Sequence, residues 1–305
     1  MGVFEQVMLP VLLIFLVGFI FQKIFRLEIK PLSTVAIYLL LPFLVFKTFY
    51  EAHLDQGFLD VVWTSLLIMG ALLILGIILG IIIGKVFHYD RQKLCGFLLA
   101  TVFPNSGNYG VPIIIFAFGQ RGVEYAMAIM VFHNILMGVV GVYIAAAANQ
   151  SGKQGIKAAG LAILKQPMNY VIIPAILLNL YQIKLSANLM KSVNMIGNIT
   201  IPLIMLILGM QLAGVTVGKV SLGNVSLAMV MRLLVSPFLA YVICTIFGLS
   251  TIITAVIVLM AAMPSAANTT MYAIQFDADP DFVSTCTLIS TLCSIGTLTV
   301  LLNIF

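Results

Sequence analysis

The sequence predicts an all-α membrane protein with ten transmembrane helices, arranged as two five-helix repeats of opposite topology. Three observations predict this fold. Of the 305 residues, 62% are hydrophobic and 8% are charged, whereas soluble domains carry about 25% charged residues. The mean hydropathy is +1.17, and apolar runs long enough for a helix to cross a bilayer recur along the whole chain. Finally, two polar, proline-containing stretches interrupt corresponding apolar runs 160 residues apart.

The apolar runs delimit the expected helices. The ten spans are expected at residues 7–25, 31–50, 61–84, 94–118, 122–146, 167–183, 193–214, 221–247, 252–275 and 281–303. The first run is longer than the apolar core of a signal peptide and follows no positive residue, so we interpret it as an uncleaved span. The cysteines lie in apolar segments without CxxC spacing, and we interpret them as small buried hydrophobic residues: Cys95, Cys244, Cys286 and Cys293.

Positive residues gather on one side of the predicted topology. Ten of the 15 Lys and Arg residues follow spans 1, 3, 5 and 7: Lys23, Arg26, Lys30, Lys85, Arg91, Lys93, Lys153, Lys157, Lys165 and Lys219. Loops rich in Lys and Arg stay in the cytoplasm. We therefore expect a multi-pass protein of the plasma membrane, with both termini outside the cytoplasm and the 147–166 loop inside it.

An internal repeat relates the two halves of the chain. A shift of 160 residues superimposes two intramembrane prolines and one asparagine: Pro42 on Pro202, Pro104 on Pro264, and Asn108 on Asn268. Since each half holds an odd number of spans, the second half must cross the membrane upside down relative to the first. We predict a first repeat at 1–146, a cytoplasmic linker at 147–166 and an inverted repeat at 167–305. Inverted repeats are typical of secondary transporters, whose substrate sites lie where broken helices of the two halves meet.

Spans 4 and 9 carry the interruptions, "FPNSGNYGVP" and "MPSAANTT". Proline costs roughly 3 kcal/mol inside a helix, so we do not expect a continuous helix through 104–110. Unwound backbone in a membrane is tolerated only where protein buries it or a watery cavity adjoins it. Half-helices that begin near Asn105 to Asn108 and near Ser265 to Asn268 would present free N–H groups and a positive dipole end to an anion. The alternative is that the polar side chains there only cap the half-helices.

Three further polar residues lie inside predicted spans. Arg232, near the middle of span 8, either balances the charge of an anionic substrate or pairs with backbone carbonyls at a helix break, and both alternatives stay open. Asn134 in span 5 aligns with Ser294 of span 10 at the 160-residue shift, and we favour a cavity-facing position for it over an interhelical hydrogen bond. Its neighbour His133 we interpret as structural.

A stripe of small residues on span 3 raises the question of a homodimer. Gly76, Gly80 and Gly84 follow the small-xxx-small pattern, which lets helices approach closely. We favour packing within the chain, although a homodimer stays open.

Acidic residues are missing from the centres of the predicted spans. All ten lie in termini, loops or span ends, whereas a cation antiporter that uses a buried carboxylate would need one inside. Sodium or proton coupling stays open, because backbone, Asn, Ser or Thr oxygens could hold an ion and a proton could travel on the substrate.

An intramembrane hydrolase is not favoured, because the sequence has no HExxH, no GxSxG and no membrane-centred aspartate pair. We therefore expect no enzyme, no metal site and no resident cofactor.

The two interruptions also carry a family resemblance. The stretches "PNSGNYGVP" and "MPSAANTTMYAIQFDADPDFVSTCTLISTL" resemble the auxin efflux carrier family, most closely its short bacterial members described as malate or malonate permeases. The resemblance implies the sodium/proton antiporter-like fold that bile acid sodium symporters share, with a scaffold from spans 1, 2, 6 and 7 and a transport domain from the other spans. It also implies that spans 4 and 9 cross, and that the transport domain moves against the scaffold as an elevator. The short central loop differs from the long hydrophilic loop of plant auxin carriers, which does not favour auxin as the substrate.

The sequence thus predicts a secondary transporter for a small organic anion, such as the dicarboxylates malate and malonate. The crossover prolines would be Pro104 and Pro264, and the substrate-binding residues would be Asn105, Ser106, Asn108, Tyr109, Asn134, Arg232, Ser265, Asn268 and Thr269. The expected partners are the carboxylate and the lipid bilayer, with no nucleic acid. A sodium-coupled symporter of the bile-acid type and a membrane sensor without transport are the alternatives.

Overall fold

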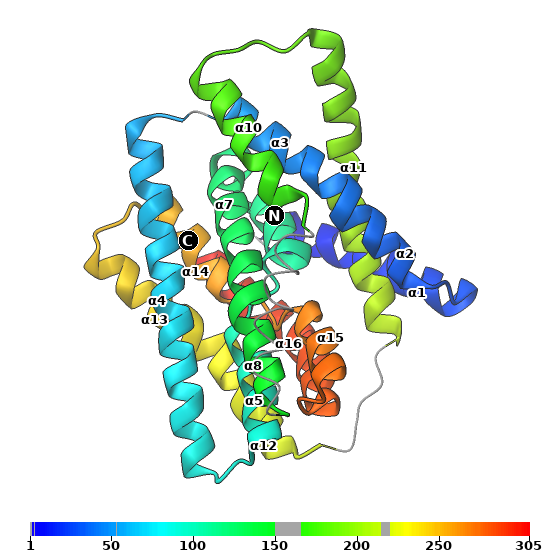
Figure 1. Ribbon diagram of the computed structural model, residues 1–305, viewed down its shortest axis with the longest axis vertical. Helices are drawn as coiled ribbons and strands as arrows, with labels where there is room; N and C mark the ends of the chain where they lie inside the picture. Colours follow the sequence, from blue (N-terminus) through cyan, green and yellow to red (C-terminus); the bar gives the residue numbers. More distant parts are fainter. Residues whose placement is uncertain (1, 3, 53, 150–165, 215–219) are drawn as a thin grey trace.

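The computed structural model describes residues 2, 4–52, 54–149, 166–214 and 220–305. Within these ranges every regular element is a helix, and one isolated bridge joins two extended segments. The all-α fold that the sequence predicts is therefore confirmed (Figure 1). The predicted linker at 147–166 lies outside the described residues except at its two ends.

Apolar runs and proline positions set the helix boundaries. The first half contains α1 (Leu9–Phe25) after a π-helical turn η1 (Phe4–Met8), α2 (Ile29–Thr34), η2 (Val35–Leu40), α3 (Leu41–Glu51), α4 (Gln56–Val86), α5 (Arg91–Val102), η3 (Ser106–Gly110), α6 (Val111–Phe118), α7 (Gln120–Leu136), η4 (Met137–Gly141) and α8 (Val142–Ala147). The second half contains α10 (Met168–Leu180), α11 (Ala187–Gly214), α12 (Leu222–Val230), η5 (Met231–Val235), α13 (Ser236–Ile246), α14 (Thr251–Ala261), α15 (Ala267–Phe276) and α16 (Pro280–Ile304). Several helices carry proline in the first turn, where its missing N–H costs nothing.

Seven helical runs in the described residues are long and apolar enough to cross a membrane: Phe4–Phe25, Ile29–Glu51, Gln56–Val86, Gly122–Ala147, Ala187–Gly214, Leu222–Ile246 and Pro280–Ile304. Shorter apolar helices lie at Ser106–Phe118, Met168–Leu180 and Thr251–Ala261. Two of the shorter helices adjoin the interruptions that the sequence predicts in spans 4 and 9. The chain is therefore a multi-pass membrane protein, while the count of ten crossings stays a prediction.

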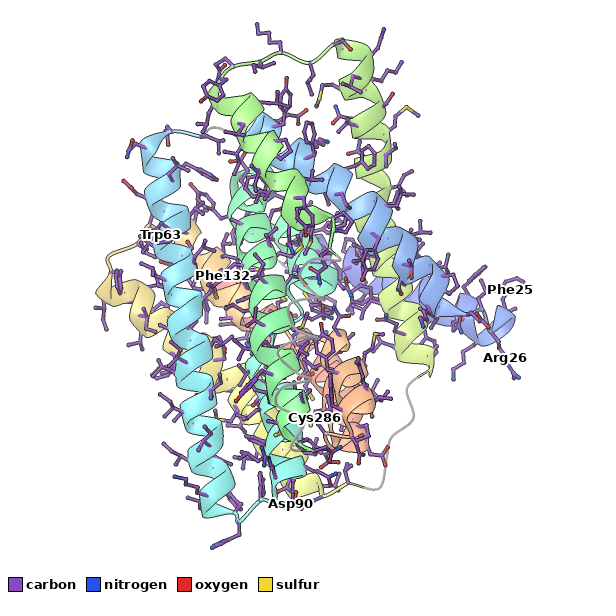
Figure 2. The ribbon with its side chains drawn as sticks, in the orientation of Figure 1. Phe25, Arg26, Trp63, Asp90, Phe132 and Cys286 are labelled. Atoms are coloured by element: carbon purple, nitrogen blue, oxygen red, sulfur yellow. The ribbon has the colours of Figure 1, made fainter. Side chains whose placement is uncertain are left out.

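Large apolar side chains cover the outside of the molecule. Trp63 on α4 and Phe25 at the end of α1 leave 65% and 58% of their surfaces exposed. Figure 2 shows both side chains at the periphery. Exposed apolar surface of this extent marks a membrane-facing protein, because acyl chains accept such side chains and water does not.

Contacts between loops show which helix ends lie together. Gln92 at the start of α5 contacts Asn149 and Asp277 through its side-chain amide. The segments after predicted spans 3, 5 and 9 therefore meet at one end. Asn179, near the end of α10, donates to the Ala52 carbonyl after α3 at 2.7 Å, which joins the segment after predicted span 2 to the end of predicted span 6. This pairing fits helices that alternate in direction, and which end faces the cytoplasm stays a prediction.

Four helices from the two halves form one packed group. Helix α11 packs against α1 and α3, and α10 packs against α3; Figure 1 shows the blue N-terminal helices beside the green α10 and α11. A Cβ atom on Gly18 would overlap the Leu206 carbonyl, and one on Gly209 would overlap the Phe15 carbonyl. The backbones of α1 and α11 are therefore in direct contact. These helices correspond to predicted spans 1, 2, 6 and 7, whose role as a scaffold domain stays a prediction.

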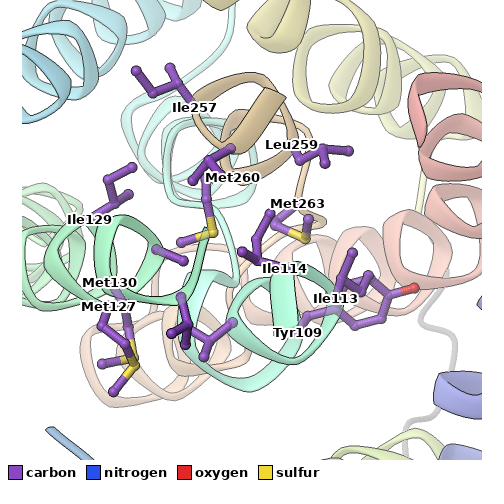
Figure 3. Packing of buried hydrophobic residues seen from close by; sticks show 14 of the residues in the cluster. Tyr109, Ile113, Ile114, Met127, Ile129, Met130, Ile257, Leu259, Met260 and Met263 are labelled. Atoms are coloured by element: carbon purple, nitrogen blue, oxygen red, sulfur yellow. The ribbon is translucent and has the colours of Figure 1, made fainter. Parts of the chain in front are cut away.

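Methionine and aliphatic side chains fill the core beside the interrupted helices. Met127 of α7, Met260 of α14, Met263 just after α14 and Ile114 of α6 belong to one cluster of buried residues (Figure 3). The glycine stripe of α4 packs inwards, because a side chain at Gly80 would meet α5. That contact is the packing within the chain that the sequence favours.

Candidate functional site

The interruptions of predicted spans 4 and 9 cross each other through their backbones. The Asn105 N–H donates to the Pro264 carbonyl at 2.7 Å, and the Ala266 N–H donates to the Phe103 carbonyl at 3.0 Å. The two segments thus form a short antiparallel bridge that includes Pro104. The bridge therefore satisfies, inside the protein, two N–H groups and two carbonyls that the broken helices leave free.

Arg232 caps the carboxyl ends of both helices that stop at the crossover. Its guanidinium donates to the Thr101 and Val102 carbonyls at the end of α5, at 2.9 and 3.1 Å, and to the Ala261 carbonyl at the end of α14. The Ser236 hydroxyl accepts from the same guanidinium at 2.9 Å. A positive charge is favourable there, because the carboxyl end of a helix carries the negative end of its dipole. These contacts have the geometry of the second alternative, pairing with carbonyls at a helix break.

The amino ends of the two new half-helices adjoin a narrow cavity, which we call the crossover cavity. The first half-helix begins at Ser106 and continues into α6, and the second is α15. Of the predicted binding residues, Asn105, Ser106, Asn108, Asn134 and Asn268 belong to its wall. Because the first N–H groups of a helix carry its positive dipole end, this wall is electrically positive without any charged side chain.

Asn105 places an unpartnered amide at this cavity. Its side chain is 5% exposed, and its Nδ2 atom has no hydrogen-bond partner. A buried donor without a partner costs about 1–3 kcal/mol, so an oxygen atom bound in the cavity would stabilise it. Asn108 and Asn268, which the repeat relates, lie partly buried on the same wall. Asn134 also lines the cavity, and its amide donates to the Met130 carbonyl at 3.0 Å.

Besides Arg232, three predicted binding residues are not part of the wall of the crossover cavity: Tyr109, Ser265 and Thr269. Tyr109 is fully buried in the apolar core, where its hydroxyl accepts a hydrogen bond from Ser294 at 3.1 Å. The Ser265 hydroxyl donates to the Ala100 carbonyl of α5. The Thr269 hydroxyl donates to a carbonyl in the preceding turn at 2.7 Å. Tyr109 and Ser265 thus connect separate elements, Thr269 bonds within its own turn, and none of the three belongs to the wall.

A second cavity, which we call the arginine cavity, adjoins the first. Its polar side chains are Thr101, His133, Arg232 and Ser236, and the rest of its wall is mainly apolar, including several side chains of α4. Phe103, Pro104 and His133 belong to the walls of both cavities. The crossover segment and one histidine of α7 therefore separate the two spaces.

Two residues of the cavity walls, His133 and Gln166, were not predicted as site residues from the sequence. His133, interpreted from the sequence as structural, belongs to both cavity walls, and its Nδ1 atom lies 2.5 Å from the Ser106 hydroxyl. Gln166, predicted from the sequence to lie in the linker, lines the crossover cavity with a buried Oε1 atom that has no partner. The position of His133 beside Asn134, inside a span, was a usable signal. Gln166 carried none, because nothing in its local sequence distinguishes it from a loop residue.

Comparison with known families identifies the class of protein. The family model described as "Membrane transport protein" matches residues 3–302. The chain belongs to the membrane transport protein family. This family is the auxin efflux carrier-like one, so the resemblance carried by the two interrupted spans is confirmed.

Two archaeal members of the family resemble the chain along its whole length. An uncharacterized transporter of Methanocaldococcus jannaschii is 27% identical over 298 residues, which cover 94% of each chain. An uncharacterized transporter of Methanothermobacter thermautotrophicus is 28% identical over 309 residues, which cover 98% of this chain and 97% of the relative. The aligned stretch in each relative therefore covers both interrupted spans.

The chemistry of the site favours a negatively charged ligand. Among the described residues that form the two walls, the ionisable side chains are His133 and Arg232. No group of three His, Cys, Asp or Glu residues in the described ranges could hold a metal ion. Amide groups and helix amino ends donate hydrogen bonds to oxyanions, so a transporter with this site is suited to an anion.

Proposed function

We propose that this membrane transport protein is a secondary transporter that moves a small organic anion, a mono- or dicarboxylate such as malate or malonate. The observation that carries the proposal is the division of charge at the crossover. Arg232 occupies the negative carboxyl ends of α5 and α14, whereas the positive amino ends of the two half-helices adjoin the crossover cavity. The negative ends are thus neutralised and the positive ends are left for a carboxylate.

The proposed mechanism is an elevator. The crossover lies in predicted spans 4 and 9, which together with spans 3, 5, 8 and 10 would move against α1, α3, α10 and α11. The second group also contributes to the wall of the crossover cavity: Ile204 of α11 and Ile37 of η2 are apolar, and Gln166 just before α10 is polar. A carboxylate held by the first group of helices and covered by the second can change its exposure when the two groups slide. The proposed location is the plasma membrane, with the 147–166 loop in the cytoplasm.

Uptake by purified protein in sealed vesicles tests the proposal. We expect uptake of radiolabelled malate or malonate that unlabelled acid competes away and that protein-free vesicles lack. Asn108→Ala and Asn268→Ala should each raise the KM, because each removes an amide from the cavity wall. A membrane sensor would show binding without uptake, and unchanged KM and rate in both variants would contradict the assignment of the two amides.

A charge substitution sharpens this test. Asn105→Asp keeps the size of the side chain and puts a negative charge against the incoming carboxylate, so uptake should fall by at least about tenfold, because like charges cost several kcal/mol. The matched control is Asn198→Asp on α11, where the Lys47 ammonium lies 3.0 Å from the exposed side chain and can pair with the new charge. The control should retain wild-type uptake.

A further inference from the structure

His133 is the ionisable residue that both cavities share. It projects from α7, and it belongs to the wall of the crossover cavity and to that of the arginine cavity. Ser106 of η3 contacts it, and the same two walls contain Arg232 of η5 and Asn268 of α15, while α4 contributes apolar side chains. Arg232 is thus the one charged side chain among the described residues of these walls.

The Ser106 hydroxyl allows His133 to bind or release a proton without losing its hydrogen bond. The hydroxyl lies 2.5 Å from Nδ1 of His133 and 3.5 Å from the Pro104 carbonyl. When the ring is neutral, the hydroxyl can donate to Nδ1. When the ring is protonated, Nδ1–H donates to the hydroxyl oxygen, and the hydroxyl hydrogen can turn to the Pro104 carbonyl. A hydroxyl donates and accepts equally well, so the pair fits both states.

A protonated His133 needs a negative partner. Arg232 already places one positive charge beside the arginine cavity, and the walls of both cavities lack a carboxylate in the described residues. A second positive charge in this poorly hydrated space is unfavourable unless an anion neutralises it. The crossover cavity, whose wall contains both His133 and the asparagine amides, is where an anion would lie close to the ring.

We propose that His133 is a proton-binding site that takes up one proton when a carboxylate enters the crossover cavity. The inference rests on the proposed function and adds the coupling ion to it. Since coupling between two ligands is reciprocal, the proton raises the affinity for the carboxylate and the carboxylate raises the affinity for the proton. Transport would then move a proton together with the anion.

This inference is tested in vesicles that contain the protein and a trapped pH-sensitive dye. Uptake of radiolabelled malonate or malate and the internal pH are measured on the same vesicles. In the wild type, uptake of the acid should carry protons into the vesicle, and the rate of uptake should depend on external pH. His133→Gln should abolish the protons that accompany each anion and flatten the pH profile. The matched control is His88→Gln, the same substitution in the exposed turn after α4, which should behave as the wild type.

A second variant keeps the inference testable if His133→Gln fails to fold. Ser106→Ala retains the ring but removes the hydroxyl that serves both protonation states, so the pH of half-maximal uptake should shift, whereas Ser106→Thr should restore it. An unshifted profile in Ser106→Ala contradicts the role of the pair.

The outcomes separate this inference from the proposed function. Uptake in the wild type without accompanying protons overturns the inference alone, as does a His133→Gln variant with wild-type proton movement. Absence of uptake of either acid by folded wild-type protein overturns the proposed function and the inference with it.

Discussion

Arg232 illustrates how a charged residue can be stable inside a membrane. Its guanidinium contacts three carbonyls at the ends of two helices and one serine hydroxyl, so most of its donors have partners. The carbonyls in turn are backbone acceptors that a broken helix cannot satisfy by itself. The Arg232 guanidinium and the helix-end carbonyls therefore stabilise each other. Removal of the guanidinium leaves the carbonyls buried without a donor, and removal of the carbonyls leaves the guanidinium buried without an acceptor.

Substitution of Arg232 should lower the stability of the folded protein. Arg232→Gln should lower the unfolding temperature in detergent, because each buried carbonyl that loses its donor costs about 1–3 kcal/mol. Arg232→Lys should lower it less, since an ammonium keeps the charge and three donors. Arg91→Gln, at an exposed position on α5, is the control and should unfold as the wild type does. Equal unfolding temperatures for all four proteins would show that the carbonyl contacts contribute nothing to stability.

At the residue scale the sequence predicted types of residue better than directions of side chains. Asn105, Asn108 and Asn268 were predicted because polar residues beside intramembrane prolines have few structural roles. Tyr109 was expected at the site and lies in the core, because the half-helix opens with a wider π-helical turn, in which the Gly110 N–H bonds to the Asn105 carbonyl. Such a turn rotates the following side chains relative to their directions in an α-helix. No pattern in the sequence predicted this π-helical turn.

At the element scale, the close approach of α1 and α11 depends on two glycines. Gly18→Ala and Gly209→Ala should each lower the unfolding temperature, because the added methyl group would overlap a backbone carbonyl oxygen that cannot move aside as a side chain can. The two helices would have to separate, and separation loses packing along their length. Thermal unfolding of the purified variants measures the effect.

Gly296→Ala is the matched control for this prediction. Gly296 lies inside helix α16, and a Cβ atom there meets no other atom within 4 Å. Alanine favours a helix over glycine by up to about 1 kcal/mol, so this variant should be as stable as the wild type or slightly more stable. A loss of stability in Gly296→Ala equal to that in Gly18→Ala would contradict the explanation by backbone contact.

The helices themselves were predictable because the bilayer sets their length. Each predicted span overlaps helical residues in the structure, since apolar runs in a membrane protein must satisfy their backbone internally. The positions of both interruptions were predictable for the same reason. The polar contacts that hold the interruptions, such as Ser265 with Ala100, were not predictable, because they join residues far apart in the chain.

The topology of the whole molecule can be tested by labelling the loops at its two ends. Two separate variants, Asn149→Cys and Ser186→Cys, each place one cysteine in the segment after predicted span 5 or predicted span 6. These two segments should face opposite sides of the membrane. A membrane-impermeant maleimide added to intact cells should label Ser186→Cys and not Asn149→Cys, because the positive-inside rule places residue 149 in the cytoplasm.

The controls for the labelling experiment are permeabilised cells, in which both variants should react, and the parent protein. Native Cys95, Cys244 and Cys286 are buried and Cys293 is exposed on a membrane-facing helix, so substitution of Cys293 gives a low background. The reverse pattern, with Asn149→Cys alone labelled, would invert the predicted orientation and leave the fold unchanged.

The bridge between the two interrupted spans is made of main-chain atoms. Asn105 and Ala266 contribute their amide N–H groups to it, and Pro264 and Phe103 contribute their carbonyls. These two hydrogen bonds do not use the side chain of Asn105, Asn108 or Asn268. If these asparagines bind the substrate as we propose, substitutions there can change selectivity while the bridge stays intact, so one architecture can accommodate different substrates in the course of evolution.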